Sequence, residues 1–212
     1  MNRTSPRWSA VVFDLGGVLI DWNPRYLYRQ LLGDVDAADA FLDEIGFAEW
    51  NANQDAGRPY AEAVEELAAR YPSRRELVEA YPARFAETLG GEVQGTAAVL
   101  RDVVDAGIPT YALSNWPAET FHHALARFEF LSWFDGIVIS GVEGIAKPDP
   151  RIFDIIAARY ALDPTTTVYI DDSPANLRAA AAKGFGIIAF SDSASLRRSL
   201  AELGVLGREA VP

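Results

Sequence analysis

The sequence contains no cysteine, only two lysines, no run of basic residues and no long apolar segment. Without cysteine there is neither a disulfide framework nor thiol chemistry, and this usage fits a reducing compartment, so we expect a cytoplasmic protein. No stretch approaches the ~18 uninterrupted apolar residues of a membrane span, so we expect no membrane insertion. Residues 1–8 are polar and lack the apolar core of a signal peptide, so none is expected there.

The charge balance is acidic, with a formal net charge of −11. An acidic chain without a basic cluster argues against general nucleic-acid binding. It also repels anionic small molecules unless one site reverses the sign locally. Of the 19 basic residues only Lys147 and Lys183 are lysines. Lys183 lies just before Gly184, at the end of a predicted alanine-rich helix, where a cation suits the helix dipole. No such position accounts for Lys147.

The 212 residues suit one domain, or one domain with a smaller insertion. Short apolar runs rich in Val, Ile, Tyr and Phe predict five strands, at residues 10–13, 110–113, 137–139, 168–170 and 187–190. Helical patterns separate the later strands, at residues 96–106, 118–128, 150–160 and 174–183. This alternation predicts an α/β fold with a parallel sheet covered by helices on both faces.

The alternation stops for about seventy residues after the first strand, where the apolar periods become helical. Pro24 and Pro59 mark helix starts, and Pro82 should kink or split the last helix of this stretch. We therefore expect a helical insertion, with residues 1–20 and 91–212 forming the core and residues 21–90 a separate helical unit.

Four predicted strands end in polar residues that complement one another. In parallel sheets, functional groups gather at the carboxyl ends of strands, near the point where the strand order reverses. Taken singly, each group also has an ordinary interpretation as a turn, loop, surface or helix-start residue. The residues, in chain order, are Asp14, Ser114, Asn115, Lys147, Asp171 and Asp172.

Together these residues predict a site for phosphoryl transfer. Three crowded carboxylates repel one another unless a cation intervenes, and oxygen ligands of this kind suit Mg²⁺. The metal and Lys147 would supply the positive charge that an acidic protein needs to bind a phosphate. The Ser114 hydroxyl and the backbone N–H groups that follow, starting at Asn115, can bind phosphoryl oxygens. Asp14 can then attack phosphorus in line to give an aspartyl-phosphate that water hydrolyses.

The chain resembles the haloacid dehalogenase-like (HAD) superfamily of hydrolases over nearly its whole length, because four motifs occur in order: FDLGGVL, LSN, KPDP and DDSPAN. The resemblance implies a Rossmann-like core with a small helical cap inserted after the first motif. It also implies roles for individual residues: Asp14 as nucleophile, Ser114 and Lys147 as phosphate binders, Asp172 with Asp171 as metal ligands, and Asn176 as a support of the last loop.

Gly16 departs from the pattern of most phosphatases in the superfamily, which carry a second aspartate two residues after the nucleophile. A glycine keeps the backbone carbonyl that ligates Mg²⁺ but lacks the acid, so general acid–base catalysis, typically ~10²–10⁴-fold, is at risk. Three hypotheses accommodate this. The first is a Mg²⁺-dependent phosphatase of a small phosphorylated substrate, such as a sugar phosphate, with a good leaving group or a proton source elsewhere, for which Asp21 is conceivable. The FDLG motif also resembles glucose-1-phosphatase-type members.

The second hypothesis is a 2-haloacid dehalogenase, since halide leaves without a proton. That branch needs no metal and usually replaces the acidic pair that is intact here. The third is a binding or scaffold protein that has kept the fold and lost turnover. Substrate choice is expected to lie in the inserted helices and beside the motif loops, where aromatic faces suit sugar rings or apolar chains. The candidates for substrate contact are Trp22, Trp50, Asn51, Gln54 and Trp116.

Overall fold

A computed structural model describes residues 8–207 of the protein. The segment for which the sequence predicts no signal peptide therefore lies outside the described residues, except for Trp8. Within the described range, no helix combines the length and the apolar character needed to cross a membrane.

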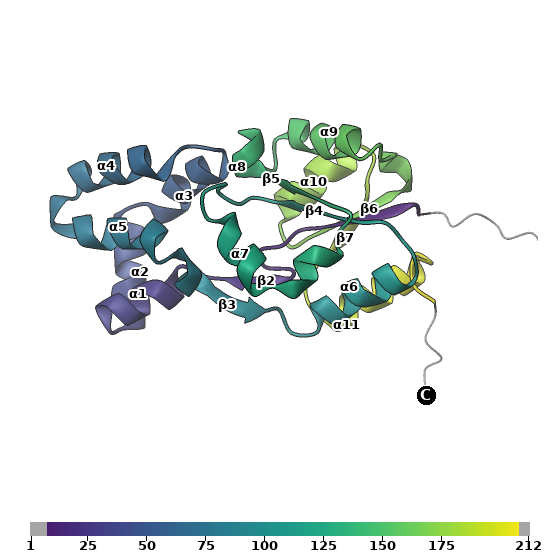
Figure 1. Ribbon diagram of the computed structural model, residues 1–212, viewed down its shortest axis with the longest axis horizontal. Coiled ribbons are helices and arrows are strands. Elements are labelled where there is room, and N and C mark those ends of the chain that lie inside the picture. Colours follow the sequence, from purple (N-terminus) through teal and green to yellow (C-terminus); the bar gives the residue numbers. More distant parts are fainter. Residues whose placement is uncertain (1–7, 208–212) are drawn as a thin grey trace, which may run out of the picture.

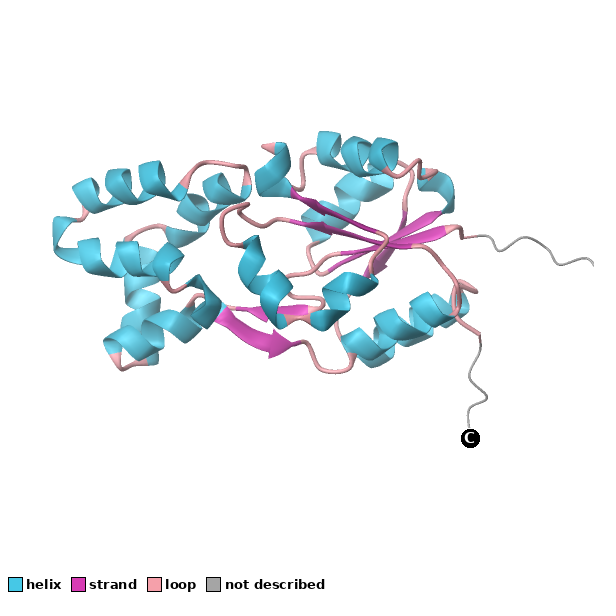
Figure 2. Ribbon diagram, viewed as in Figure 1, coloured by secondary structure: helices cyan, strands magenta, loops and turns pink. Residues whose placement is uncertain are grey.

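The core is a five-stranded parallel sheet with strand order β5-β4-β1-β6-β7 (Figures 1 and 2). The predicted strand count, type and parallel pairing are confirmed. The chain runs outward from the central β1 to β4 and β5 on one side, and then to β6 and β7 on the other. The strands are β1 (Ala10–Phe13), β4 (Thr110–Ser114), β5 (Gly136–Ile139), β6 (Thr167–Asp171) and β7 (Gly186–Ala189).

The last strand begins and ends one residue earlier than the sequence predicted. Glycine usually marks a strand boundary, yet Gly186 pairs in register with Val168. A Cβ at Gly186 would lie 2.3 Å from the ring of Trp8, so only glycine lets this indole pack against the strand. The pairing of a glycine with a distant tryptophan is not visible in a local pattern.

Side chains alternate across the sheet and form an apolar layer on each face. Val12 packs with α9 (Pro150–Arg159) and α10 (Pro174–Ala182) on one face. Val11 and Phe13 pack on the other, which α6 (Thr96–Asp105) and α11 (Ser193–Glu202) cover. Figure 1 shows these helix pairs on opposite sides of the sheet. The predicted helices α6, α9 and α10 are confirmed to within one residue.

The remaining core helices are shorter. The helix predicted at residues 118–128 begins later, as α7 (Phe121–Arg127), because residues 118–120 form a turn in which Thr120 N–H donates to Pro117 O at 3.2 Å. The structure also contains α8 (Ser140–Glu143) and two 3₁₀ turns, η3 (Glu129–Trp133) and η4 (Pro164–Thr166).

Five helices lie between the first strand of the sheet and α6, and they form the left-hand part of Figure 1. We call this helical unit the cap. Aromatic rings fill its interior around Tyr81, which is fully buried and contacts the rings of five other aromatic residues. Pro82 lies inside α5, which ends one residue later, as the sequence predicted. The cap helices are α1 (Arg25–Leu32), α2 (Val35–Glu44), α3 (Phe47–Asp55), α4 (Tyr60–Arg70) and α5 (Arg75–Ala83), with 3₁₀ turns η1 (Pro72–Arg74) and η2 (Phe85–Thr88).

A two-stranded antiparallel ribbon, β2 (Ile20–Trp22) with β3 (Leu89–Glu92), stands where the chain enters and leaves the cap. The sequence expectation of a purely helical insertion missed it, because both strands are short and β3 contains two glycines. Gly90 is needed because a Cβ there would lie 2.3 Å from the Asp21 carboxylate. The Tyr26 hydroxyl donates to the same carboxylate at 2.6 Å. The division at residues 21–90 stays our interpretation of this arrangement.

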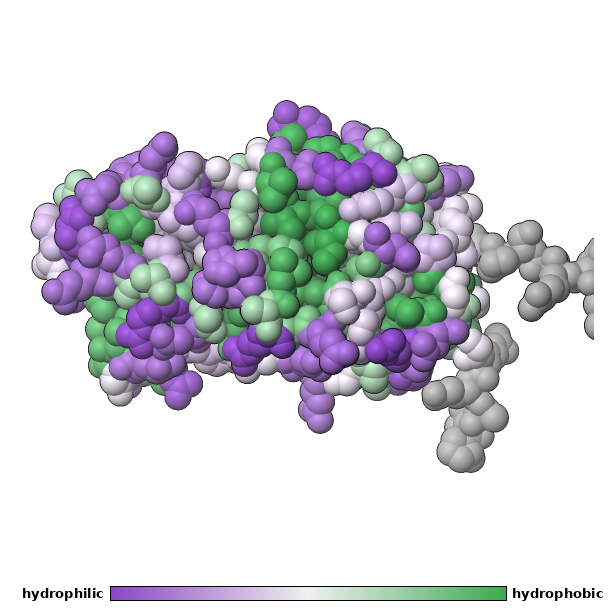
Figure 3. Space-filling view, viewed as in Figure 1, coloured by the Kyte–Doolittle hydropathy of each residue, from purple (hydrophilic) through white to green (hydrophobic). Residues whose placement is uncertain are grey.

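On the face seen in Figure 3, the most continuous apolar surface lies along the middle of the molecule, and smaller apolar areas lie among polar side chains toward both ends.

Candidate active site

Asp14 lies one residue beyond the end of β1, the central strand of the sheet. Its backbone N–H donates to Ile170 O at 2.9 Å, which continues the pairing with β6 into the loop. One carboxylate oxygen, Oδ1, accepts the Leu15 N–H at 2.7 Å. The residue is 7% exposed. Burial raises the pKa of Asp14 to about 7, against the opposing pull of the Lys147 ammonium.

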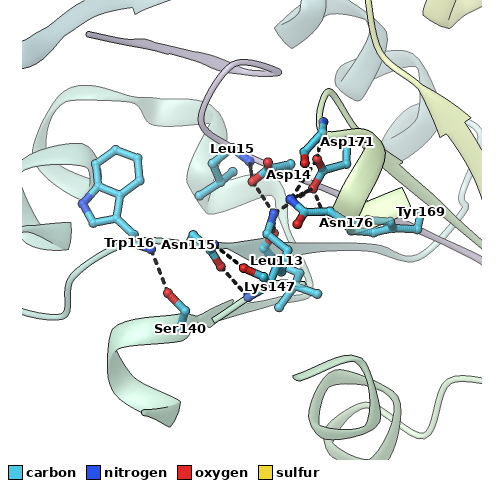
Figure 4. Close-up of polar contacts among 11 residues, drawn as sticks. Asp14, Leu15, Leu113, Asn115, Trp116, Ser140, Lys147, Tyr169, Asp171 and Asn176 are labelled. Atoms are coloured by element: carbon cyan, nitrogen blue, oxygen red, sulfur yellow. Dashed lines mark hydrogen bonds and ion pairs between the residues drawn. The ribbon is translucent and has the colours of Figure 1, made fainter. Parts of the chain in front are cut away.

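Lys147 is the buried cation that the predicted site requires. Its side chain is 1% exposed, and its ammonium lies 2.8 Å from Asp14 Oδ1 and 2.9 Å from Asp171 Oδ2. It also donates to Leu113 O at 2.9 Å, so three acceptors match its three N–H donors (Figure 4). Although burial lowers it, the two carboxylates keep the pKa of Lys147 above its ordinary value. One ammonium thus joins the carboxyl ends of β1, β4 and β6.

Asn115 holds the backbone of Lys147 in place. Its side-chain amide donates to Lys147 O at 2.9 Å, and its side-chain carbonyl accepts the Lys147 N–H at 2.8 Å. Asp149 then accepts the Arg151 N–H at 2.9 Å and caps α9, with Pro150 at the first helical position. Because the side chain of Asn115 is occupied, the predicted phosphate contact of this residue would come from its backbone N–H. This contact stays a prediction.

Asp171, the last residue of β6, is fully buried and surrounded by donors. Oδ1 accepts the Ser173 N–H at 2.7 Å, and the Asn176 amide lies 3.1 Å from both carboxylate oxygens. Oδ2 accepts Lys147 and the Tyr169 hydroxyl. Although burial raises it, the Lys147 charge and these hydrogen bonds hold the pKa of Asp171 below its ordinary value. Asn176 has the supporting position that the sequence resemblance implied.

Asp172 completes a cluster that can hold a metal ion. One carboxylate oxygen from each of Asp14, Asp171 and Asp172 lies within 4.8 Å of the others. Partial burial and the charge of Asp171 raise the pKa of Asp172, as expected for crowded carboxylates. An all-carboxylate set beside a backbone turn fits a hard cation such as Mg²⁺. Both carboxylate oxygens of Asp171 accept hydrogen bonds from protein groups. Asp172 and Asp14 therefore have the oxygens that are more available to a metal ion.

The turn after Asp14 brings its backbone against this cluster. Gly17 has φ +76°, and a Cβ there would lie 2.4 Å from Asp172 Oδ2. Gly16 differs: its φ lies outside the left-handed region, and a Cβ would meet nothing within 4 Å. Only the second glycine is required by the fold, so the missing side chain at Gly16 leaves open space near Asp14.

Ser114 ends β4 beside Asp14. The residue is 1% exposed, and its hydroxyl has no hydrogen-bond partner among the described residues. Burying an unpaired hydroxyl is costly, and such groups in native proteins are usually ligand contacts or positions for unseen water. The orphaned hydroxyl fits the predicted phosphate contact.

A cavity of about 50 Å³ lies between these loops and the cap. Three of the five predicted substrate-contact residues line it: Trp22, Asn51 and Trp116. The other two face elsewhere. The Trp50 indole donates to Ala63 O at 3.1 Å inside the cap, and the Gln54 amide is buried with no partner among residues 8–207. The remaining lining residues are Gly16, Asp55, Tyr81, Phe85, Asn115 and Pro117.

Sequence reasoning missed two residues of functional interest. Tyr169 lies in the apolar strand β6. The apolar pattern of this strand did not indicate that the Tyr169 hydroxyl donates to Asp171, two residues later in the chain. Asp55 directly follows Gln54 in the inserted segment, yet tryptophan and amide side chains drew attention there instead. Its position at the last residue of α3 was a usable signal, because the helix dipole disfavours a carboxylate at that end.

Comparison with known proteins places this site in a recognised context. The family model of haloacid dehalogenase-like hydrolases matches residues 8–184. The sesquiterpene phosphatase of Aspergillus oryzae is 25% identical over 196 residues, which cover 92% of this chain and 96% of that protein. Hexitol phosphatase B of Escherichia coli is 27% identical over 180 residues, covering 77% of this chain and 75% of that protein.

One solved structure shares the fold over most of the chain. It is a HAD family enzyme from Bacteroides thetaiotaomicron in complex with magnesium and inorganic phosphate. It superposes with a TM-score of 0.66 at 21% identity, covering 87% of this chain and 95% of that one.

Proposed function

The chain belongs to the haloacid dehalogenase-like hydrolase family, and from this premise we propose that it is a Mg²⁺-dependent phosphatase that hydrolyses a small phosphate monoester through an aspartyl-phosphate on Asp14. The observation that carries the proposal is the buried Lys147 ammonium, which lies 2.8 Å from Asp14 and 2.9 Å from Asp171 with Asp172 beside them. This arrangement places one buried cation directly against the carboxylate of Asp14 in an otherwise acidic protein.

One carboxylate oxygen of Asp14 is free for attack on phosphorus. Its Oδ1 accepts Leu15 N–H and the Lys147 ammonium, whereas Oδ2 accepts no hydrogen bond from a described residue. Oδ2 is therefore the oxygen that attacks phosphorus, while Lys147 holds Oδ1 and neutralises the phosphoryl charge. The Ser114 hydroxyl and the Asn115 N–H bind the phosphoryl oxygens, whereas the Trp116 N–H already donates to Ser140 Oγ at 2.9 Å.

Mg²⁺ would be held by carboxylate oxygens of Asp14 and Asp172 and by the Gly16 carbonyl, with Asp171 as a further candidate ligand. When bound, the ion would neutralise charge on the phosphoryl oxygens and the carboxylates. The magnesium and phosphate named for the Bacteroides structure, and the phosphatase activities named for the two relatives, support this proposal.

The cavity favours a substrate with an apolar or ring-shaped group. Aromatic side chains of Trp22, Tyr81, Phe85 and Trp116 line it, and such faces pack well on sugar rings or hydrocarbon. At about 50 Å³ it is far smaller than the ~300 Å³ or more of a usual ligand pocket. We infer that the cap moves about the β2–β3 ribbon to admit the substrate.

The test is a panel of sugar, polyol, prenyl and aryl phosphates, with phosphate release followed in Mg²⁺ and in EDTA. Chloride release from 2-chloropropionate is followed in parallel. We expect Mg²⁺-dependent phosphate release and no chloride. Metal-independent chloride release would replace the proposal with the dehalogenase hypothesis, and no turnover of either kind would favour a binding role.

A further inference from the structure

We propose that Asp55, carried by the cap, is the catalytic acid and base of this site: it protonates the leaving oxygen and later deprotonates the hydrolytic water. It thus replaces the side chain absent at Gly16. The inference rests on the proposed phosphatase function and names a residue that the superfamily motifs do not contain.

The position of Asp55 carries the inference. Asp55 and Gly16 line the same cavity, one from the cap and one from the loop of the nucleophile. A Cβ at Gly16 would meet nothing within 4 Å, so no other side chain has filled the space where an acid would stand. The leaving group must pass between the nucleophile loop and the cap, and Asp55 borders that space.

A hydrogen-bonded chain of buried side chains orients Asp55. The Tyr81 hydroxyl, at the centre of the cap, donates to Asn51 Oδ1 at 3.1 Å. The Asn51 amide in turn donates to Asp55 Oδ2 at 3.1 Å. No hydrogen bond from a described residue reaches Asp55 Oδ1, which leaves this oxygen to carry the transferred proton. The donation to Oδ2 fixes the carboxyl plane.

The surroundings favour a protonated Asp55 near neutral pH. Burial raises the pKa of Asp55 to about 7, while the Lys147 ammonium and the Asn51 hydrogen bond lower it. Tyr60 and Tyr81 are the other titratable groups that face it from the cap, and Glu119 accepts the backbone N–H of Tyr60. Asp55 is also the last residue of α3, where the helix dipole disfavours a negatively charged carboxylate. A general acid works best with a pKa near the working pH.

The proposed steps balance. In the first, Asp14 Oδ2 forms a bond to phosphorus, and the bond from phosphorus to the leaving oxygen breaks. The leaving oxygen takes the proton of Asp55 and departs as an alcohol, which leaves Asp55 as a carboxylate. In the second, this carboxylate takes a proton from water as the water oxygen attacks phosphorus. The Asp14–phosphorus bond breaks, inorganic phosphate forms, and Asp55 is protonated again.

Asp21, which the sequence offered as a conceivable proton source, is a matched control. Its carboxylate accepts the Tyr26 hydroxyl at 2.6 Å and packs on Gly90 in the β2–β3 ribbon. It is not among the residues that line the cavity. Asp21→Asn removes a carboxylic acid of the same kind without touching the cavity.

The experiment measures single-turnover formation of the phosphoenzyme across a series of aryl and alkyl phosphates at saturating Mg²⁺. We compare the wild type, Asp55→Asn and Asp21→Asn, with urea unfolding as the check of fold. Asp55→Asn should slow primary alkyl substrates by about 10²–10⁴-fold and the best aryl substrates little, because only poor leaving groups need the proton. Its phosphoenzyme should also persist with aryl substrates, since hydrolysis lacks its base. Asp21→Asn should follow the wild type.

Rescue tests the inference independently. Gly16→Asp in the Asp55→Asn background should restore alkyl substrates, because the open space at Gly16 accepts the new carboxyl. If Asp55→Asn slows all substrates equally, or none, or if Asp21→Asn steepens the leaving-group dependence instead, Asp55 is not the acid and the phosphatase proposal still stands. If no phosphoenzyme forms with any substrate in the wild type, the proposed function itself fails.

Discussion

Lys147→Met should destabilise the protein strongly, because it removes a cation that two buried carboxylates share. The ammonium makes three contacts of 2.8–2.9 Å, to Asp14, Asp171 and Leu113 O. Removing one partner of a buried ion pair typically costs about 3–5 kcal/mol, mostly from the charge left uncompensated. Lys183→Met is a matched control from the only other lysine. Its ion pair with Asp154, at 2.6 Å, has side chains 31% and 59% exposed, so less than about 1 kcal/mol is expected.

The destabilisation by Lys147→Met should also grow with pH. The pKa of Asp14 is already raised to about 7 with Lys147 present, and losing the cation raises it further. A folded state that holds one proton more than the unfolded state loses about 1.4 kcal/mol of stability per pH unit. In the wild type, stability stops falling with pH near pH 7, where Asp14 becomes ionised in the folded state. In Lys147→Met it continues to fall above about pH 7. The difference in unfolding free energy between the two proteins should therefore widen by about 2 kcal/mol between about pH 7 and about pH 8.5.

Urea unfolding in EDTA at several pH values measures both effects for the two lysine variants. Equal losses for Lys147→Met and Lys183→Met, or a difference from the wild type that stays flat with pH, would refute the reasoning.

Three further predictions follow from the same geometry. Lys147→Arg should reduce turnover despite keeping the charge, because a planar guanidinium cannot replace a compact ammonium among three close acceptors; steady-state kinetics near wild type would contradict this. Asp172→Ala should weaken Mg²⁺ binding and activation by removing the ligand with the freest oxygens, which a Mg²⁺ titration of phosphate release measures. Gly17→Ala should lower stability by at least about 1 kcal/mol and weaken Mg²⁺ binding, since its Cβ would stand 2.4 Å from Asp172 Oδ2 at φ +76°. Gly16→Ala is its tolerated control.

The sheet was predictable because its strands carry their own signals. Fully buried parallel strands such as β1 and β6 are largely apolar runs. Asp14 directly follows β1, and Asp171 is the last residue of β6, so both acids lie at the edge where ligands bind. The carboxyl ends of β1, β4 and β6 do meet around Lys147, which follows β5 and α8 in the chain. Their spacing along the chain is informative because parallel strands place successive carboxyl ends on one edge.

The parts that the sequence missed depend on contacts between distant segments. The β2–β3 ribbon is too short for a period, and Gly186 is a strand residue only because Trp8 packs on it. Asp55 and Gly16 are 39 positions apart in the numbering. Their common cavity exists only when the cap folds over the nucleophile loop, so no local pattern could pair a missing acid with its substitute.

In the proposed function Asp14 becomes phosphorylated during turnover, and trapping the phosphoenzyme measures this step itself. The protein is mixed with an aryl phosphate in Mg²⁺, quenched in acid after a short time, digested and examined by mass spectrometry. We expect one added phosphoryl group on Asp14 that is absent in EDTA and in Asp14→Asn. A full turnover rate in Asp14→Asn, or a phosphoryl group on another residue in the wild type, would contradict it.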